Sequence, residues 1–288
     1  MSSELPPFVP TTGFKYTASP NPTWTYGQGI EATPEGQAWA EGEKAGWTVI
    51  DASTEDPGKL YSVLLSGIAP RPVAFVSSIS ADGIENLAPF SWFNQITQTP
   101  PLLSIACAHS SGAAKDTARN IQAGTGFTVN IISEAWVEQS NIASTNAPFD
   151  ISEWPISGLT KAPSVHVKAP RVKESAFSME CELYQAIEIK DPKTDIITST
   201  FILGLIKYIH IRNDVIDPER GVADPGKLKP IARMGGLTYA KVSEGYILPR
   251  KPWKEVGREI KETLGDSING PNSTTGKVPD SGGVKSGL

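Results

Sequence analysis

The sequence has few residues of the kinds that bind metals or form disulfides. Its 288 residues include only two cysteines and three histidines. Cys107 and Cys181 lie in separate apolar segments without CxxC spacing. His109, His166 and His210 occupy unrelated segments without the spacing of metal ligands. We therefore expect no disulfide framework and no metal site, but two buried thiols in a reducing compartment.

Long apolar runs and basic clusters are also missing. No uninterrupted apolar run approaches the length of a membrane span, and the first residues, MSSELPPFVP, lack the charged and apolar regions of a secretion signal. The formal net charge is -5, and no basic run is present to neutralise phosphates along a nucleic acid. These absences predict a cytoplasmic protein without a membrane or nucleic-acid partner.

Several common catalytic and nucleotide-binding motifs do not occur. The sequence contains no GxGxxG after a strand, no GxxxxGK[ST], no GxSxG and no HExxH. The first two absences argue against a Rossmann domain and a P-loop, and the last two against a serine hydrolase and a zinc protease. A nicotinamide nucleotide, if used, must bind without a Rossmann domain.

The most informative stretch runs from residue 71 to residue 101, RPVAFVSSISADGIENLAPFSWFNQITQTPP. Residues 72–79 are apolar and β-branched, which predicts a strand, and Asp82-Gly83 is typical of a hairpin turn. Residues 86–94 then interleave amides and a hydroxyl with aromatic rings. Such a loop suits a flat heteroaromatic ligand. From these residues alone, ordinary turn chemistry at the edge of a core is the alternative.

Long strands dominate the rest of the pattern. Residues 177–189 alternate, with apolar side chains on one parity and Ser178, Glu180 and Glu182 on the other, which predicts a long half-buried strand. A second long strand follows over 196–211. Shorter strands are expected over 102–108 and 127–132, and helices over 59–65, 115–123, 134–144 and 253–264. Few helices between long strands favour an antiparallel barrel.

A second polar segment covers residues 109–120, HSSGAAKDTARN, between a predicted strand and a predicted helix. Hydroxyl groups, backbone N–H groups and the ammonium of Lys115 would meet there, and a phosphate would suit them. Asp116 or Thr117 is expected to cap the helix, and Gly124 follows its end. A capped loop without a ligand is the alternative.

These segments resemble the flavin reductase-like family, FMN-binding proteins of the split β-barrel fold. The family pattern is PRP, an aliphatic residue, AxVS, then DG, then NxAPFS, an aromatic residue, FN and finally PP. The matching positions are Pro70, Arg71, Pro72, Ala74, Val76, Ser77, Asp82, Gly83, Asn86, Ala88, Pro89, Phe90, Ser91, Phe93, Asn94, Pro100 and Pro101. In the family, KDT followed by Asn lies in the FMN phosphate region, and Lys115, Asp116, Thr117 and Asn120 match it.

The resemblance implies a mainly β, antiparallel split barrel of Greek-key type, paired as a homodimer with FMN near the subunit interface. NADH or NADPH would reduce the flavin, which would pass electrons to a partner monooxygenase or another acceptor. The alternatives are an FMN electron carrier without a nucleotide site, and a split barrel that holds haem or a pyridoxal derivative. The positions assigned to FMN are Val73, Ala74, Ser77, Asn86, Leu87, Ala88, Pro89, Ser91, Phe93, Asn94, Ser110, Ser111, Lys115, Asp116, Thr117 and Asn120.

His210 is the candidate catalytic side chain. It shares its parity with Ile202 and Ile206, which is more typical of a structural histidine, and only the resemblance brings it near the flavin or the nicotinamide. Most of the chemistry would belong to the cofactor. Leu205 replaces a Glu that the family usually carries. The Ser-Ser-Gly-Ala-Ala stretch before Lys115 lacks a frequent Arg, which favours modest, reversible FMN binding.

The domain organisation follows from composition. Residues 1–57 are rich in Pro and Trp and predict an arm that docks Trp24, Trp39 and Trp47 on the barrel or on a partner subunit. Residues 58–248 form the predicted flavin reductase-like domain, and 249–264 a C-terminal helix. Residues 265–288 have almost no apolar side chains and predict a disordered tail.

Overall fold

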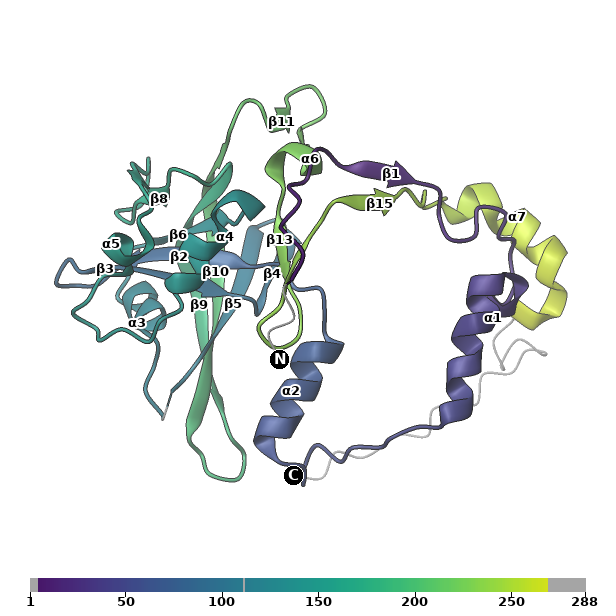
Figure 1. Cartoon of the computed structure of the whole chain (residues 1–288), viewed down its shortest axis with the longest axis horizontal. Coiled ribbons are helices and arrows are strands. Elements are labelled where there is room, and N and C mark those ends of the chain that lie inside the picture. The colour runs from purple at the N-terminus through teal and green to yellow at the C-terminus, as the bar shows by residue number, and fades with distance from the viewer. Residues whose placement is uncertain (1–4, 111, 269–288) are drawn as a thin grey trace, which may run out of the picture. The chain divides into compact units, whose positions relative to one another are not determined.

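The computed structural model describes residues 5–110 and 112–268 and divides the chain into two compact units (Figure 1). The first unit contains residues 5–15 and Asp51–Gly245, and the second contains Tyr16–Ile50 and residues from Tyr246 onward. Strands β1 (Lys15–Thr17) and β15 (Glu244–Tyr246), which form a two-stranded sheet, contain the boundary residues. Most of the predicted disordered tail, residues 269–288, lies outside the described residues.

The first unit is built on a seven-stranded antiparallel sheet in the order β3-β2-β6-β9-β10-β5-β4. Strands β2 and β3, β4 and β5, and β9 and β10 pair as hairpins, and the tight turn at Asp82-Gly83 joins the first of these pairs, with Gly83 at a φ of +87°. The strands are β2 (Ala74–Ile79), β3 (Glu85–Phe90), β4 (Phe93–Gln98), β5 (Pro101–Ala108), β6 (Phe127–Ile131), β9 (Phe177–Lys190) and β10 (Ile197–Ile211). The predicted mainly β, antiparallel class is confirmed.

Two apolar cores lie on the two faces of this sheet. Ala74 and Val76 of β2 belong to one core, whereas Val73 and Phe75 belong to the other, as the alternation of side chains along a strand requires. The first core also takes residues from β5, β6, β9 and β10, so the sheet curves around it. Within the described residues, the edge strands β3 and β4 are not paired with each other, and the sheet is open.

Helices and short strands complete the first unit. The second core takes Trp136 and Trp154 from helical segments beside the sheet, whereas Ala118 and Ile121 of α3 pack into the first. The helical segments are α2 (Pro57–Gly67), α3 (Asp116–Gln122), η3 (Glu134–Trp136), α4 (Val137–Ile142), α5 (Glu153–Ser157) and α6 (Pro225–Leu228). The short paired strands are β7 (Lys161–Ala162) with β8 (Arg171–Val172), β11 (Ile216–Asp217) with β12 (Val222–Ala223), and β13 (Ile231–Arg233) with β14 (Tyr239–Lys241).

Strand β9 corrects one expectation from the sequence. The polar side chains on one face of this strand were expected to be exposed, but near the start of the strand Ser178 and Glu180 are fully buried. The segment before β8 covers them and supplies hydrogen bonds to Glu180. Further along, β9 is no longer paired with β6 and runs beside β10, which is paired with β5 on its other side as far as Ser199. Tyr184, Ile187 and Ile189 lie on this part of β9 and are exposed, and the turn end of the hairpin projects beyond β5 (Figure 1).

Residues 5–15 belong to the first unit, although the sequence predicted one arm over 1–57. Thr11 holds them there, since its N–H and its hydroxyl donate to the two carboxylate oxygens of Glu134 at 2.8 and 2.6 Å. Both residues are buried. A charged acceptor that receives two such bonds strengthens them, which explains why this segment is placed with the sheet.

The second unit is mainly helical. Its segments are η1 (Ile30–Ala32), α1 (Pro34–Glu41), η2 (Gly42–Ala45), α7 (Trp253–Leu264) and η4 (Gly265–Ile268). Helix α7 has the predicted bounds, and η4 occupies the first four residues of the predicted disordered tail. Trp39 and Trp47 are 80% and 83% exposed, and their docking stays a prediction. No described helix is long and apolar enough to cross a membrane.

Candidate functional site

The two segments that the sequence singled out lie on neighbouring elements. Residues 86–90 form most of β3, and Lys115 immediately precedes α3. Strand β3 pairs with β2 in a register that sets Leu87 opposite Ser77 and Phe90 opposite Ala74. The tertiary fold therefore brings the amide-rich strand and the Lys-Asp-Thr turn to one region.

Two adjoining hollows lie in this region, each of about 190 Å³. They share Pro89, Phe90 and Lys115. The β3–α3 hollow is lined by Asn86, Ala88, Pro89, Phe90, Lys115, Asp116, Thr117, Ala143, Ser144, Thr145, Asn146, Ala147 and Glu153. The α2–β5 hollow is lined by Tyr61, Leu65, Pro89, Phe90, Ser91, Trp92, Ala106, Ala108 and Lys115. One side of the region is thus polar and carries charge, and the other is mainly apolar and aromatic.

Lys115 is the cation that both hollows share. Its ammonium lies 3.4 Å from Oδ1 of Asn146, and among the described residues no carboxylate is within 4 Å of it. Its backbone is the N-cap of α3, without a side-chain cap, so neither Asp116 nor Thr117 caps this helix as the sequence predicted. Asp116 is instead inside the first turn and bonds to Arg119. A lysine without a carboxylate partner can bind an anionic ligand.

Asn86, Thr117 and Asn120 are committed to a buried network. The Thr117 hydroxyl donates to Asn86 Oδ1 at 2.7 Å, and Asn120 Nδ2 donates to the hydroxyl of Ser78 at 3.1 Å. These bonds tie α3 to β2 and β3. The three side chains therefore hold the walls of the β3–α3 hollow in place, and buried polar groups paired in this way stabilise a defined geometry.

Glu153 completes that network and was missed by the sequence reasoning. Its Oε2 accepts from Asn86 Nδ2 and from the backbone N–H of Leu87, both at 3.0 Å, and the residue is 4% exposed. Burial raises the pKa of this carboxyl, and the nearby charge of Asp116 raises it further, although the hydrogen bonds act in the opposite direction. Glu153 lies 67 residues from Asn86, so no local pattern could have indicated the contact.

Arg71 matches the family pattern but was not assigned a role from the sequence. It connects the α2–β5 hollow to the sheet. Its guanidinium is largely buried and donates to the carbonyl oxygens of Leu65 and Met234 at 2.6 and 2.9 Å. Leu65 belongs to α2, which also supplies Tyr61, whose ring centroid is 6.3 Å from that of Trp92. The arginine therefore fixes the helix that forms the apolar wall.

Not every predicted FMN residue lines these hollows. Val73, Ala74 and Leu87 are buried in the two cores, and Phe93 packs against the first. Asn94 is exposed, and its Oδ1 accepts from the adjacent N–H of Gln95. Ser77, whose hydroxyl is buried and has no hydrogen-bond partner among the described residues, and Ser110, which bridges to Ala113, line neither hollow. Ser111 lies outside the described residues. The predicted residues that do line them are Asn86, Ala88, Pro89, Ser91, Lys115, Asp116 and Thr117.

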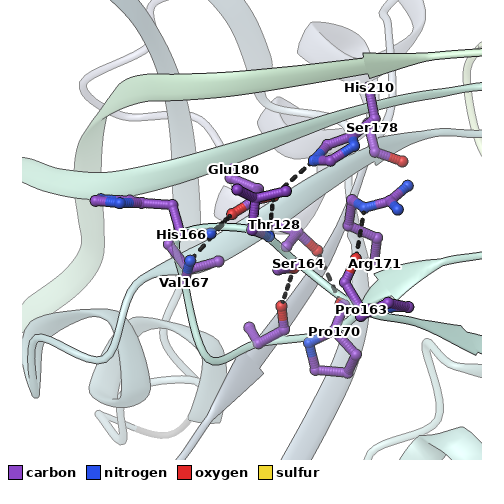
Figure 2. Close-up of polar contacts among 12 residues, drawn as sticks. Thr128, Pro163, Ser164, His166, Val167, Pro170, Arg171, Ser178, Glu180 and His210 are labelled. Carbon is purple, nitrogen blue, oxygen red and sulfur yellow. Dashed lines mark hydrogen bonds and ion pairs between the residues drawn. The ribbon is translucent and has the colours of Figure 1, made fainter.

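His210 has a carboxylate partner on the neighbouring strand (Figure 2). Its Nε2 lies 2.6 Å from Oε1 of Glu180, and the backbone N–H groups of Val165, His166 and Val167 also donate to this carboxylate. Burial alone would raise the pKa of Glu180, but these hydrogen bonds outweigh it and hold the pKa at about 2. His210 lines neither hollow, and its catalytic role stays a prediction.

Residues 66–231 match the family model described as the flavin reductase like domain. The chain belongs to the flavin reductase-like family. The match covers the seven-stranded sheet and both hollow-forming segments from β3 and α3, and it begins at the end of α2. The second unit lies outside the matched residues.

Relatives with known sequences or structures agree with this assignment. The uncharacterized protein YwrF of Bacillus subtilis is 36% identical over 66% of this chain and 92% of its own length. Nitrilotriacetate monooxygenase component B from Bacillus cereus is 33% identical, with a TM-score of 0.68 over 70% of this chain and 99% of that one. The 2-nitrobenzoate 2-nitroreductase NbaA of Pseudomonas fluorescens is 28% identical, with a TM-score of 0.64 over 72% and 98% of the two chains.

Proposed function

We propose that the chain is an FMN-dependent oxidoreductase that accepts hydride from NADH or NADPH. The observation that carries the proposal is the meeting of Pro89, Phe90 and Lys115 at two adjoining hollows, one apolar and aromatic, the other polar. Flavin mononucleotide has both characters, since a flat ring system is joined to a phosphate. Membership of the flavin reductase-like family supports the same ligand.

The residues present fit this cofactor. Lys115 has no carboxylate partner among the described residues and would pair with the phosphate. Tyr61, Phe90 and Trp92 would lie against the ring system, and the hydroxyl of Ser91 would meet its polar edge. The buried Asn86–Thr117 pair would keep β3 and α3 at a fixed separation without a direct bond to the cofactor.

The bound flavin would supply the redox chemistry by accepting a hydride, which carries two electrons. The protein's own residues would orient the ring and exclude water, because aromatic and apolar side chains line the α2–β5 hollow. No side chain of the two hollows is required as a general acid or base in this scheme. The family resemblance implies that the nicotinamide nucleotide would bind over the exposed face of the ring, without a Rossmann domain.

The proposed acceptor of the reduced flavin is a partner enzyme. A relative of 33% identity is component B of a nitrilotriacetate monooxygenase, which supports transfer of reduced flavin or electrons to a monooxygenase. A relative of 28% identity is a 2-nitrobenzoate 2-nitroreductase, which favours a second candidate, the direct reduction of a nitroaromatic compound at the same site. Oxidation of NADH with and without 2-nitrobenzoate, under anaerobic conditions, separates the two.

We further propose that the open sheet is a split barrel and that two copies of the chain form a homodimer. Exposed apolar side chains on the projecting β9–β10 hairpin support this, since contiguous apolar patches on a monomer usually mark an interface. Light scattering after size exclusion measures the mass directly. A species of 30.8 kDa at micromolar concentration would contradict the dimer.

The cofactor site is tested with Lys115→Ala. Titration of the protein with FMN, followed by the change in flavin absorbance or fluorescence, should show binding about ten- to hundredfold weaker in the variant, since a charge-assisted hydrogen bond is worth about 1.5–3 kcal/mol. Lys173→Ala, an exposed lysine outside both hollows, is the matched control and should bind as wild type. Equal affinity in all three proteins would contradict the assignment.

Turnover separates a reductase from an electron carrier. In the presence of excess FMN, the proposed reductase oxidises NADH or NADPH continuously, whereas a carrier without a nucleotide site does so only when a separate reductase is added. A haem or pyridoxal protein would be distinguished by its absorption spectrum after reconstitution. Absence of any flavin binding would reject the proposed function as a whole.

A further inference from the structure

The β3–α3 hollow has an unusual charge balance for a pocket that accepts an anion. Three charged side chains line it: Lys115, Asp116 and Glu153. With both carboxyl groups ionised, the lining carries one positive and two negative charges. An entering phosphate would add further negative charge, and like charges in a partly buried site oppose each other strongly.

The two carboxyl groups differ in how they are compensated. Asp116 is paired with Arg119, whose Nη2 lies 2.9 Å from its Oδ1. Glu153 has no ion pair among the described residues, and the donors to its carboxyl are all neutral: Asn86 Nδ2 and the N–H of Leu87, both to Oε2, and the N–H of Glu153 itself. Because Glu153 is also the more deeply buried of the two, it is the group that is more readily neutralised by a proton.

The other charged groups around Glu153 do not change this conclusion. Helix α5 packs against β3, which carries Glu85, and against α4, which carries Glu138. Lys161 is bonded to Glu85 and lies 5.7 Å from the ring centroid of Trp154. The cation of the β3–α3 hollow, Lys115, bonds to Asn146 instead of Glu153.

We propose that Glu153 couples the binding of an anionic ligand in this hollow to the uptake of one proton. The inference rests on the proposed function, with the phosphate of FMN as the anion beside Lys115. The proton comes from solvent and stays on the carboxyl group, and no bond or electron is transferred. Glu153 is therefore a positioning residue that holds β3 in both protonation states and adjusts the charge of the hollow.

The hydrogen bonds that tie Glu153 to β3 permit this change. The donors of Asn86 and Leu87 both reach the same oxygen, Oε2, at 3.0 Å, and the third donor to the carboxyl is the N–H of Glu153 itself. A proton can reside on Oε1, and the remaining carbonyl oxygen still accepts from Asn86 and Leu87. Burial and the charge of Asp116 already raise the pKa of this carboxyl, and a bound anion acts in the same direction.

The test is calorimetric titration of the full chain with FMN in two buffers of different ionisation enthalpy, at several pH values from 6 to 8. The difference in heat gives the number of protons taken up on binding. Wild type should take up more protons than Glu153→Gln, and its affinity relative to that variant should fall as pH rises, by up to about tenfold per pH unit for full coupling. Protonation of the phosphate, whose second pKa is about 6, contributes equally to both proteins.

Two controls make the result specific. Glu138→Gln removes a neighbouring carboxyl that does not line the hollow and should behave as wild type. Riboflavin has the same ring system without the phosphate, and its binding should show no proton difference between wild type and Glu153→Gln. Circular dichroism checks that the Gln variant, which retains a carbonyl acceptor, is folded.

The outcomes are distinguishable. Equal proton uptake by wild type and Glu153→Gln, with FMN bound to both, overturns the coupling and leaves the proposed function intact. The same difference with riboflavin as with FMN also overturns it, because the coupling would then belong to the ring. Wild-type protein that binds neither flavin overturns the proposed function and this inference together.

Discussion

Glu180 and His210 form a diagonal pair on adjacent strands of the sheet, with 2.6 Å between Oε1 of the carboxylate and Nε2 of the imidazole. The carboxylate is fully buried, and three consecutive backbone N–H groups of residues 165–167 donate to its two oxygens. Figure 2 shows the covering segment held against β9 by these bonds. A buried charge that is compensated in this way holds the segment in place, and removing the charge lowers the free energy of unfolding strongly.

Glu180→Ala should strongly destabilise the fold. The substitution leaves three part-buried N–H groups without their acceptor and His210 without its partner, and the loss of a fully buried carboxylate paired in this way costs about 3–5 kcal/mol. Urea unfolding followed by circular dichroism measures the change. Glu182→Ala is the control, because this carboxylate is 44% exposed and pairs with His166 and Lys207 at the surface, so its loss should cost less than about 1 kcal/mol. Similar losses for the two variants would contradict the assigned role.

The same carboxylate predicts an acid-dependent loss of stability. The folded state lowers the pKa of Glu180 from 4.5 to about 2, so the unfolded chain binds the proton more readily. The ionised carboxylate therefore contributes stability above pH 4.5, and the contribution is lost as pH falls from about 4.5 towards 2, by up to about 3 kcal/mol. Free energies of unfolding measured from pH 2.5 to 6 should fall more steeply in wild type than in Glu180→Gln. Parallel curves for the two proteins would show that groups other than Glu180 determine the pH dependence of the free energy of unfolding.

His210→Gln separates a structural role from a catalytic one. Because His210 bonds to Glu180 and lines neither hollow, we expect a loss of about 1–3 kcal/mol of stability, the range for a hydrogen bond to a charged group. FMN affinity and the rate of flavin reduction should stay within about twofold of wild type, since a hydrogen bond lost at a distance leaves the site's contacts intact. A rate reduced more than tenfold in a folded variant would support the catalytic role that the family resemblance implies.

Gly204→Ala should destabilise the first core. A Cβ at this position would lie 2.6 Å from Cζ of Phe127 and 3.1 Å from Cδ1 of Leu103, and both side chains are buried. Overpacking of this kind costs about 1–3 kcal/mol. Gly67→Ala is the control, because an added Cβ there, at the end of α2, meets no atom of the described part of the chain within 4 Å, and alanine favours a helix by up to about 1 kcal/mol over glycine. Thermal unfolding of both variants should shift in opposite directions.

Local patterns in the sequence were sufficient for much of the fold. The Asp82-Gly83 pair predicted the hairpin turn, and Gly83 has the positive φ that such turns favour. Helix α7 has the predicted bounds, and the two long strands differ from the prediction by at most one residue at each end. These features depend on side chains that are close in sequence, so their signal survives without tertiary information.

The errors have a common cause. The N-cap of α3 is Lys115 and not Asp116 or Thr117, because the Thr117 hydroxyl bonds to Asn86 and Asp116 bonds to Arg119. The polar parity at the start of β9 is buried because another segment covers it. Helix α5 was not among the helices that the sequence predicted. In each case a partner distant in sequence, or a competing side-chain bond, decided the outcome.

The sequence alone determined the antiparallel β class, the hairpin at residues 82–83 and the two segments that resemble the flavin reductase-like family, since each depends on alternation, turn residues or spacing within about thirty residues. Only the tertiary structure decided which of those residues line a hollow and which are buried in the two apolar cores. It set Lys115 beside Pro89 and Phe90, and it placed Glu153 under Asn86 across 67 residues of chain. The physical reason is that burial, hydrogen-bond partners and local charge balance belong to the packed arrangement of separate segments, and no single segment encodes them.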